Sequence, residues 1–391
     1  MTERSPAASA PNTNTPGWLL LLKSRSLRMV LVLLGLWTVL GLHPETSDAF
    51  LTAGNFSNLT AQVSEIVIIG VGMTLVVLIR GIDLSVGAGM ALTGVIAAKL
   101  QIDAQQSAFV AVLAGVFAAA LIGLWHGVLV TRFAIPPFIA TLSGFLAYRG
   151  AGLVLSDARG LSPMREDFSK LATVLPASIS MGICVGGALV GVALLVMQER
   201  RRKQFSLPTH DSKALVLLGV AIVGTSAFFA TIYQRGMPVP VLIAALATVL
   251  GAVLLERSRL GRYAVAIGGN SEAARLSGVP VERVTVAIYL LTGVLTAIAG
   301  MVATARTNGV TPGNAGVMRE LHVISAVVIG GTSLTGGRAT MVGTVVGALI
   351  FGTLSNGMNL MNINSNWQLI FTGLILLGAS LLDSLSSRKT T

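Results

Sequence analysis

The stretch LVVLIRGIDLSVGAGMALTGV, residues 75–95, places two charged side chains between apolar runs. Arg80 and Asp83 have only Gly81 and Ile82 between them. A charge in the middle of a bilayer costs about 2.5–3.5 kcal/mol on the insertion scale, whereas a charge at a helix junction reaches water or a partner. The stretch therefore predicts two apolar helices separated by a polar break.

The composition of the whole chain indicates a membrane protein. Of its 391 residues, 53% are hydrophobic and 11% are charged, and the mean hydropathy is +0.80. A water-soluble chain of this length needs more polar surface. Because an unpaired backbone group in lipid costs several kcal/mol, only helices or closed barrels span a bilayer, and uninterrupted apolar runs favour helices. We expect an all-α, polytopic helical membrane protein.

Apolar runs long enough to cross a bilayer recur along the chain, since about 20 residues span a hydrocarbon core of about 30 Å. The candidate crossings are about 28–43, 59–79, 84–100, 107–131, 135–156, 177–197, 214–233, 238–255, 284–305, 321–336, 340–361 and 367–382. The segments 84–100 and 321–336 are short and rich in Gly, so each either crosses fully or enters half of the membrane while buried in protein. This predicts about 10–12 transmembrane helices with broken or re-entrant segments.

A weak internal repeat appears at an offset of 250 residues. VLIRGIDLSVGAGMALTGVIAA (77–98) lies without gaps over VVIGGTSLTGGRATMVGTVVGA (327–348), with seven identical positions. Duplicated broken helices are typical of transporters and indicate a pathway between the halves, while the orientation of the repeat stays open. The polar residues of these breaks and of the stretch 356–368 are candidates for a pathway or gate: Arg80, Asp83, Ser85, Thr332, Ser333, Asn356, Asn359, Trp367 and Gln368.

The break after Arg80 has two interpretations. Gly81 lets the first helix stop, and Asp83 or Ser85 can cap the amides of the next helix. Alternatively, the charge of Asp83 holds a gate by pairing with Arg80 or with a basic group across a dimer. Both interpretations remain open at the level of sequence.

The net charge of +11 is explained by cytoplasmic loops rather than by a nucleic-acid partner. Basic residues gather at 200–203 and in the loop 256–283, whereas the connection 43–58 contains no Lys or Arg. This asymmetry predicts that both termini are cytoplasmic. Residues 1–17 are polar and are expected to form a disordered cytoplasmic tail, and residues 18–391 form a single transmembrane domain.

Motifs for catalysis or metal binding are missing. The histidines at 43, 126, 210 and 322 lack ligand-like spacing, and neither a phosphate-binding GxxxxGK[ST] loop nor GxSxG nor HExxH is present. We therefore predict no catalytic residue, no metal site, no cofactor and no enzymatic activity of this chain itself.

The segment AIGGNSEAARLSGVPVERV, residues 266–284, predicts a helix of about two turns. Gly268 and Gly269 break the chain, Asn270 or Ser271 caps the helix, and Gly278 followed by Pro280 stops it. So short a helix is marginal alone, and it must dock on its own loops or on another subunit.

Several motifs in order along residues 18–385 resemble the permease subunits of bacterial ABC importers for ribose, xylose, arabinose and related sugars. They are GIDLSVG (81–87), FIATLSGFLAYRG (138–150), GGNSEAARLSGV (268–279), VIGGTSLTGG (328–337) and NGMNLMNINSNWQ (356–368). An extra helix pair at about 177–234 makes the chain most similar to the xylose-type permease. Where the family commonly has Glu-Leu-Asp, this chain has Glu320, Leu321 and His322, so it departs from the family at that acidic position.

The resemblance implies a membrane-embedded permease domain in the bacterial cytoplasmic (inner) membrane. It implies a homodimer of permease copies, a periplasmic sugar-binding protein and a cytosolic ABC ATPase that carries ATP and Mg. The expected cargo is a monosaccharide, a pentose such as D-xylose. The ATPase-coupling role falls on the loop 256–283, and within it on Gly268, Gly269, Asn270, Glu272, Ala273, Ala274, Arg275, Leu276, Ser277 and Gly278.

A second class of function is an ion-coupled secondary sugar transporter, in which Glu65, Asp83 and His126 serve as titrating sites. The docking helix and the basic loops argue against it. A membrane-embedded enzyme has no catalytic cluster in this sequence.

Overall fold

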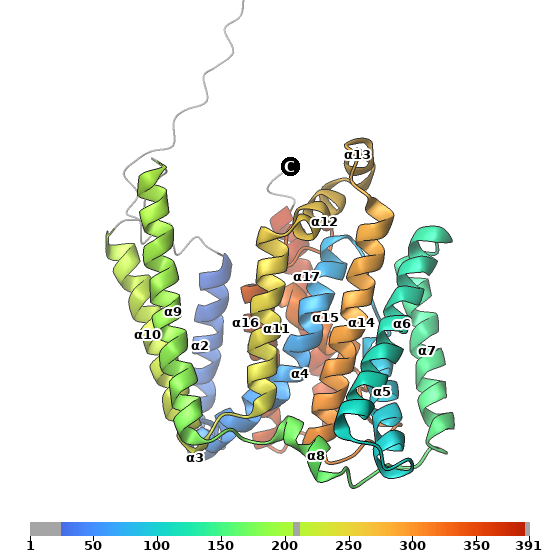
Figure 1. The fold of residues 1–391 in the computed structure, drawn as a ribbon. Helices are drawn as coiled ribbons and strands as arrows, with labels where there is room; N and C mark the ends of the chain where they lie inside the picture. The colour runs from blue at the N-terminus through green and yellow to red at the C-terminus, as the bar shows by residue number, and fades with distance from the viewer. Residues whose placement is uncertain (1–24, 206–211, 388–391) are drawn as a thin grey trace, which may run out of the picture.

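The computed structural model describes residues 25–205 and 212–387 (Figure 1), so the tail predicted for residues 1–17 lies outside the described part. The described residues form helices joined by loops, with isolated β-bridges at Leu161–Val310 and Val174–Pro238. The all-α prediction is confirmed. The start of α2 and the end of α17 lie on the side of the molecule that carries α12 and α13 (Figure 1).

The helices in chain order are α2 (Arg25–Leu42), α3 (Ser47–Phe50), α4 (Ala53–Leu78), α5 (Val86–Ile102), α6 (Ala108–Arg132), α7 (Pro137–Leu155), α8 (Glu166–Ser169), α9 (Ala177–Gln204), α10 (Ser212–Ile232), α11 (Val239–Arg257), α12 (Arg259–Gly269), α13 (Ser271–Leu276), α14 (Val281–Arg306), α15 (Arg319–Ile329), α16 (Met341–Leu360) and α17 (Ser365–Ser387). Two 3₁₀ turns, η1 (Lys170–Ala172) and η2 (Tyr233–Arg235), flank the pair α9 and α10.

Each of the twelve candidate crossings coincides with a helix, although not every helix is long enough to span a bilayer. Within the described residues, eight helices are long and apolar enough to cross a membrane. Helix α15 has 11 residues, or about 16 Å at 1.5 Å per residue. Of the two alternatives left open for 321–336, this length fits a segment that enters half of the membrane and not a full crossing. The helix ends at Ile329 because Gly330 and Gly331 follow, and Gly331 has a left-handed φ of 93°.

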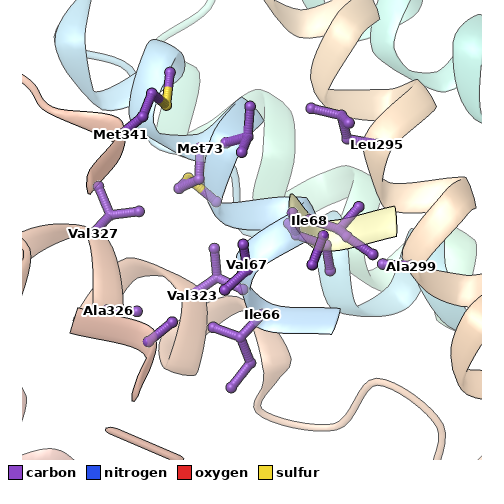
Figure 2. Packing of buried hydrophobic residues seen from close by; sticks show 14 of the residues in the cluster. Ile66, Val67, Ile68, Met73, Leu295, Ala299, Val323, Ala326, Val327 and Met341 are labelled. Carbon is purple, nitrogen blue, oxygen red and sulfur yellow. The ribbon is translucent and has the colours of Figure 1, made fainter. Parts of the chain in front are cut away.

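Helix α4 is the centre of the bundle. In its most apolar 18-residue window, 94% of the residues are buried, which fits a helix that is apolar on all sides. Figure 2 shows Ile66, Val67, Ile68 and Met73 in this core, with α14 residues Leu295 and Ala299 and α15 residues such as Val327 packed around it. Helix α4 therefore packs against the surrounding helices on all of its faces and extends from one end of the bundle to the other.

The extra helix pair expected at about 177–234 is present as α9 and α10. It stands at the rim beside α2 (Figure 1), and only 11% and 6% of its most apolar windows are buried. Apolar side chains exposed along both helices, such as Leu189 and Val220, suit contact with lipid tails.

Closely spaced glycines pack helices together, as expected for small residues in a membrane bundle. A Cβ at Gly123 of α6 would collide with the backbone of Tyr289 in α14, and one at Gly347 of α16 would collide with the carbonyl of Ala326 in α15. The stripe at Gly182, Gly186 and Gly187 differs, since nothing lies within 4 Å of a Cβ built there.

Two pairs of helices are related by inversion. Helices α4 and α14 each have 26 residues and run antiparallel, because Gly72 lies against Thr292 while Glu65 contacts Arg306. Each is followed by irregular backbone, 79–85 or 307–318, and then by a shorter helix. Helix α5 runs back alongside α14, and α15 runs alongside α4, as the contacts Gly94–Thr304 and Gly70–Val327 show.

The inversion differs from the repeat that the sequence suggested. The offset of 250 residues pairs the break at 79–85 with the break after α15, and the structure does place irregular backbone at 330–340. The longer correspondence, however, is between α4–α5 and α14–α15. Their irregular segments differ in length, so an ungapped comparison of the sequence does not detect them.

Candidate functional site

Three chain segments meet at one junction, which we define by Leu78, Arg80, Gly268 and Gly337. Arg80 donates from Nε to the carbonyl of Gly268 at 2.8 Å and from Nη2 to that of Gly269 at 2.5 Å. The amide of Gly337 donates to the carbonyl of Leu78 at 3.0 Å. The two breaks that follow α4 and α15 are therefore connected to each other and to the end of α12.

Arg80 occupies an uncommon backbone conformation at this junction. Its φ of 64° lies in the left-handed region, which costs a non-glycine residue about 1–2 kcal/mol. The two hydrogen bonds to carbonyls at the end of α12 offset that cost, and cations are favoured at helix C-termini. No ion pair joins Arg80 to Asp83 in the described chain, where Arg80 instead binds the carbonyls of Gly268 and Gly269.

Glycines at the junction allow backbone to approach backbone. A Cβ at Gly268 would collide with the carbonyl oxygen of Leu78 and the amide nitrogen of Gly337. Gly336 and Gly337 have left-handed φ values of 81° and 77°. The segments are thus held at a distance that only glycine permits.

Helix α13 has the caps that the sequence predicts. Asn270 accepts a hydrogen bond from the amide of Ala273 at 3.0 Å, and Gly278, with φ of 82°, ends the helix. The amide of Val279 closes the end by donating to the carbonyl of Ala274 at 3.0 Å. The predicted short helix is confirmed.

The surface of α13 is free to meet a partner. The helix projects beyond the ends of its neighbours (Figure 1). Leu276 at its tip is 81% exposed, more than any other exposed large apolar side chain in the described residues. Arg275 forms an ion pair with Glu282 of α14 at 2.9 Å, which connects the end of α13 to the start of α14. Glu272 and Ser277 are exposed on the same helix.

Asp83 is buried, with 3% of its surface exposed, and it organises the start of α5. Its Oδ1 accepts hydrogen bonds from the amide of Ser85 at 2.9 Å and from the Ser85 hydroxyl at 2.6 Å. The Ser85 hydroxyl also lies 3.4 Å from Nδ1 of His126, and Nε2 of His126 lies 3.1 Å from the Tyr148 hydroxyl. Asp83 thus fixes the turn before α5, and Ser85 occupies the N-cap position without capping by its side chain.

Replacing Asp83 separates its geometric role from its charge. Asp83→Asn retains an acceptor for both Ser85 donors, so the free energy of unfolding should change little, whereas Asp83→Ala should lose about 1 kcal/mol. Thermal unfolding of the detergent-purified variants measures both. If Asn proves as damaging as Ala, the charge of Asp83 is required and the turn is not its main role.

The remaining pathway candidates fall in three other places. Thr332 and Ser333 are buried in the break after α15, where the amide of Ser333 donates to the carbonyl of Arg338 at 3.0 Å. Asn356 exchanges two hydrogen bonds with Asn55, at 2.9 and 3.0 Å. The structure does not bring Asn356 to Asp83.

The last three candidates lie where α16 turns into α17. Asn359 accepts a hydrogen bond from Gln368 at 2.8 Å. Trp367 is 57% exposed, and its ring centroid lies 6.4 Å from that of Phe371. These contacts stabilise the turn at the end of the molecule away from α13.

A buried charge cluster was missed by motif reasoning, except that Glu65 was considered as a titrating group. Glu65 in α4 has no exposed surface. Its Oε1 lies 2.9 Å from Nη2 of Arg306, and its Oε2 lies 2.9 Å from Nη2 of Arg319 as an ion pair without hydrogen-bond alignment. The sequence signal for this cluster is that Arg306 follows the apolar run 284–305 and Arg319 precedes the run 321–336.

The unusual His322 is a packing residue in this fold. Its ring lies on α15 with its centroid 4.6 Å from that of Phe351 in α16. The preceding acidic residue, Glu320, is 93% buried and points at Gly87 in the first turn of α5, where a Cβ would collide with its carboxylate. Among the described residues, no group of three or more His, Cys, Asp or Glu side chains is placed to hold a metal ion.

Comparison with known proteins identifies the family. A family model described as the branched-chain amino acid transport system / permease component matches residues 55–380. The chain is 36% identical to the xylose transport system permease protein of Haemophilus influenzae over 375 residues, 94% of this chain and 99% of that protein. It is 35% identical to the Escherichia coli K12 xylose permease over the whole of both chains, and 35% identical to the ribose import permease of that strain over 95% of each. No solved structure matches the chain.

Proposed function

Because the chain belongs to this family of transport-system permease components, we propose that it carries a monosaccharide across the bacterial inner membrane as the permease subunit of an ABC importer. The relatives are named for xylose and ribose, which supports a pentose such as D-xylose as the cargo. Permease subunits of this kind are not enzymes, and ATP hydrolysis belongs to a separate subunit. The family membership favours this function over an ion-coupled secondary transporter.

The observation that carries the proposal is the connection of α13 to the helix breaks. The tip of α13 exposes Leu276, and Arg80 ties the end of α12, directly before α13, to the break after α4. A push on α13 by an ATPase that binds ATP and Mg is therefore transmitted to residues 79–85 without passing through a flexible loop.

The same arrangement supports an orientation. The basic residues at 200–203 and in the loop 256–283 lie toward the end that carries α13, and basic loops favour the cytoplasm. Both termini are then cytoplasmic, and a periplasmic binding protein delivers sugar to the opposite end. A second copy of the chain completes the permease, and exposed apolar side chains face membrane lipid.

The function is tested by reconstitution of the permease with its ATPase and binding protein in lipid vesicles, with uptake of labelled D-xylose as the measurement. Uptake should require ATP. Leu276→Ser should weaken ATPase binding about tenfold or more, because burial of a Leu side chain is worth about 1.5–3 kcal/mol.

Leu42→Ser is the matched control, since Leu42 is 78% exposed and is the last residue of α2, which ends beside α3 on the side of the molecule away from α13 (Figure 1). It should leave ATPase binding unchanged. Uptake that needs no ATPase and stops when a proton ionophore is added would instead establish the secondary transporter.

A further inference from the structure

A polar cavity lies beside the centre of the bundle, opposite the end that carries α13. Its volume is about 370 Å³, and helices α4, α5 and α14 and the start of α15 line it together with the loops that follow α7 and α14. This volume lies within the range of about 300–1,000 Å³ that is typical of small-molecule sites. The cavity is large enough for one monosaccharide.

The charged groups of the cavity are fixed by one another. Glu65 is fully buried between Arg306 and Arg319, whose side chains are 31% and 23% exposed. One carboxylate against two guanidinium groups leaves an excess of one positive charge. In the described part of the chain, Nε of Arg319 is buried without a hydrogen-bond partner. A buried donor of this kind indicates a missing acceptor.

Irregular backbone forms one wall of the cavity. Residues 307–318 connect α14 to α15. Arg149 of α7 fixes this segment by donating to the carbonyls of Pro312 and Ala315 at 2.8 and 2.7 Å. Backbone of this kind is tolerated within a membrane only where protein buries it or where it lines a water-filled cavity. Broken helices of transporters place substrates at such positions.

The cavity is also joined to the break before α5. Gly316, which lines the cavity, has a φ of 65° and packs against the backbone of Gly87, in the first turn of α5. The break at 79–85 lies between that turn and the junction with α12, where Arg80 binds the carbonyls of Gly268 and Gly269. Movement of the break therefore changes the wall of the cavity.

We propose that this cavity binds the sugar during its passage, with Glu65 accepting hydrogen bonds from hydroxyl groups and Arg319 donating to them; this inference rests on the proposed function. Hydroxyl groups both donate and accept, so a neutral polyol satisfies a carboxylate and a guanidinium together. Asn314, Thr311 and Thr304 supply further polar groups, and no aromatic side chain lines the cavity. The site therefore lacks a stacking surface, which keeps binding weak enough for release.

The experiment measures how sugar protects a cysteine in the cavity. Cys184 is the single cysteine of the chain, so Cys184→Ala with Asn314→Cys provides one exposed reporter thiol. The labelling rate with a small thiol reagent is measured on the permease–ATPase complex in lipid nanodiscs, with increasing D-xylose or D-ribose. Labelling should slow about fivefold when the sugar reaches about four times its Kd.

Ala104→Cys in the same background is the control, because Ala104 is exposed in the loop after α5 and does not line the cavity. Its labelling should not respond to sugar. Arg319→Lys keeps the charge but loses the planar Nε donor, so the half-protecting sugar concentration should rise about tenfold. Thr311→Cys replaces Asn314→Cys as the reporter if the latter does not fold.

The inference fails if neither sugar protects either reporter, or if sulfate protects and sugars do not, which would indicate an anion site. Uptake by the cysteine-free parent separates this failure from failure of the proposed function. ATP-driven uptake without protection removes the cavity as a sugar site and leaves the importer intact. Absence of uptake together with absence of protection removes both.

Discussion

Glu65→Leu should lower the free energy of unfolding by about 3–5 kcal/mol, the usual loss when one partner of a buried ion pair is removed. Leu has a similar volume, so the expected loss comes from charge rather than from a cavity. In the native protein, Arg306 and Arg319 each lie 2.9 Å from the Glu65 carboxylate. The substitution leaves these two guanidinium groups close together without a counter-ion. Thermal unfolding in detergent, followed by the loss of monodisperse protein, measures the effect.

Asp103→Ala is the control for the Glu65 experiment. Asp103 also pairs with a cation, Lys99, but the two side chains are 49% and 39% exposed. Solvent screens such a pair, so its removal should produce no resolvable change. Equal losses for Glu65→Leu and Asp103→Ala would show that burial does not strengthen the Glu65 cluster.

Gly268→Ala should destabilise the protein by about 1–3 kcal/mol or more, which is typical of overpacking in a tight site. The new methyl group would collide with the carbonyl of Leu78 and the amide of Gly337. Both are backbone atoms, so neither can rotate away as the end of a flexible side chain can. The separation of α12 from the two breaks must then increase, which also strains the hydrogen bonds of Arg80.

Gly269→Ala is the matched control for the junction. Gly269 is the next residue in α12, and nothing lies within 4 Å of a Cβ built on it. Ala favours a helix over Gly by up to about 1 kcal/mol, so the unfolding temperature should stay the same or rise. A Gly268→Ala variant that is as stable as Gly269→Ala would mean that the junction is looser than the contacts indicate.

Local and compositional signals in the sequence were sufficient for the class of fold and for most helices. A hydrophobic content of 53% and long apolar runs leave helices as the way to satisfy the backbone in lipid. The short helix α13 was also predictable, because Asn270 caps it and Gly278 ends it through contacts with residues a few positions away in the sequence. The cap and the stop are properties of neighbouring residues, so they can be read without knowledge of the fold.

The partners of Arg80 and Glu65 were decided by the tertiary structure. Arg80 binds the carbonyls of Gly268 and Gly269, 188 and 189 residues away. Every residue has a carbonyl, so no pattern of side chains marks these acceptors. Glu65 meets Arg306 across 241 residues, and only the antiparallel packing of α4 and α14 brings them together. Likewise, Gly330 and Gly331 mark the end of α15 locally, but its late start follows from the irregular backbone at 307–318, which Arg149 of the distant helix α7 holds in place.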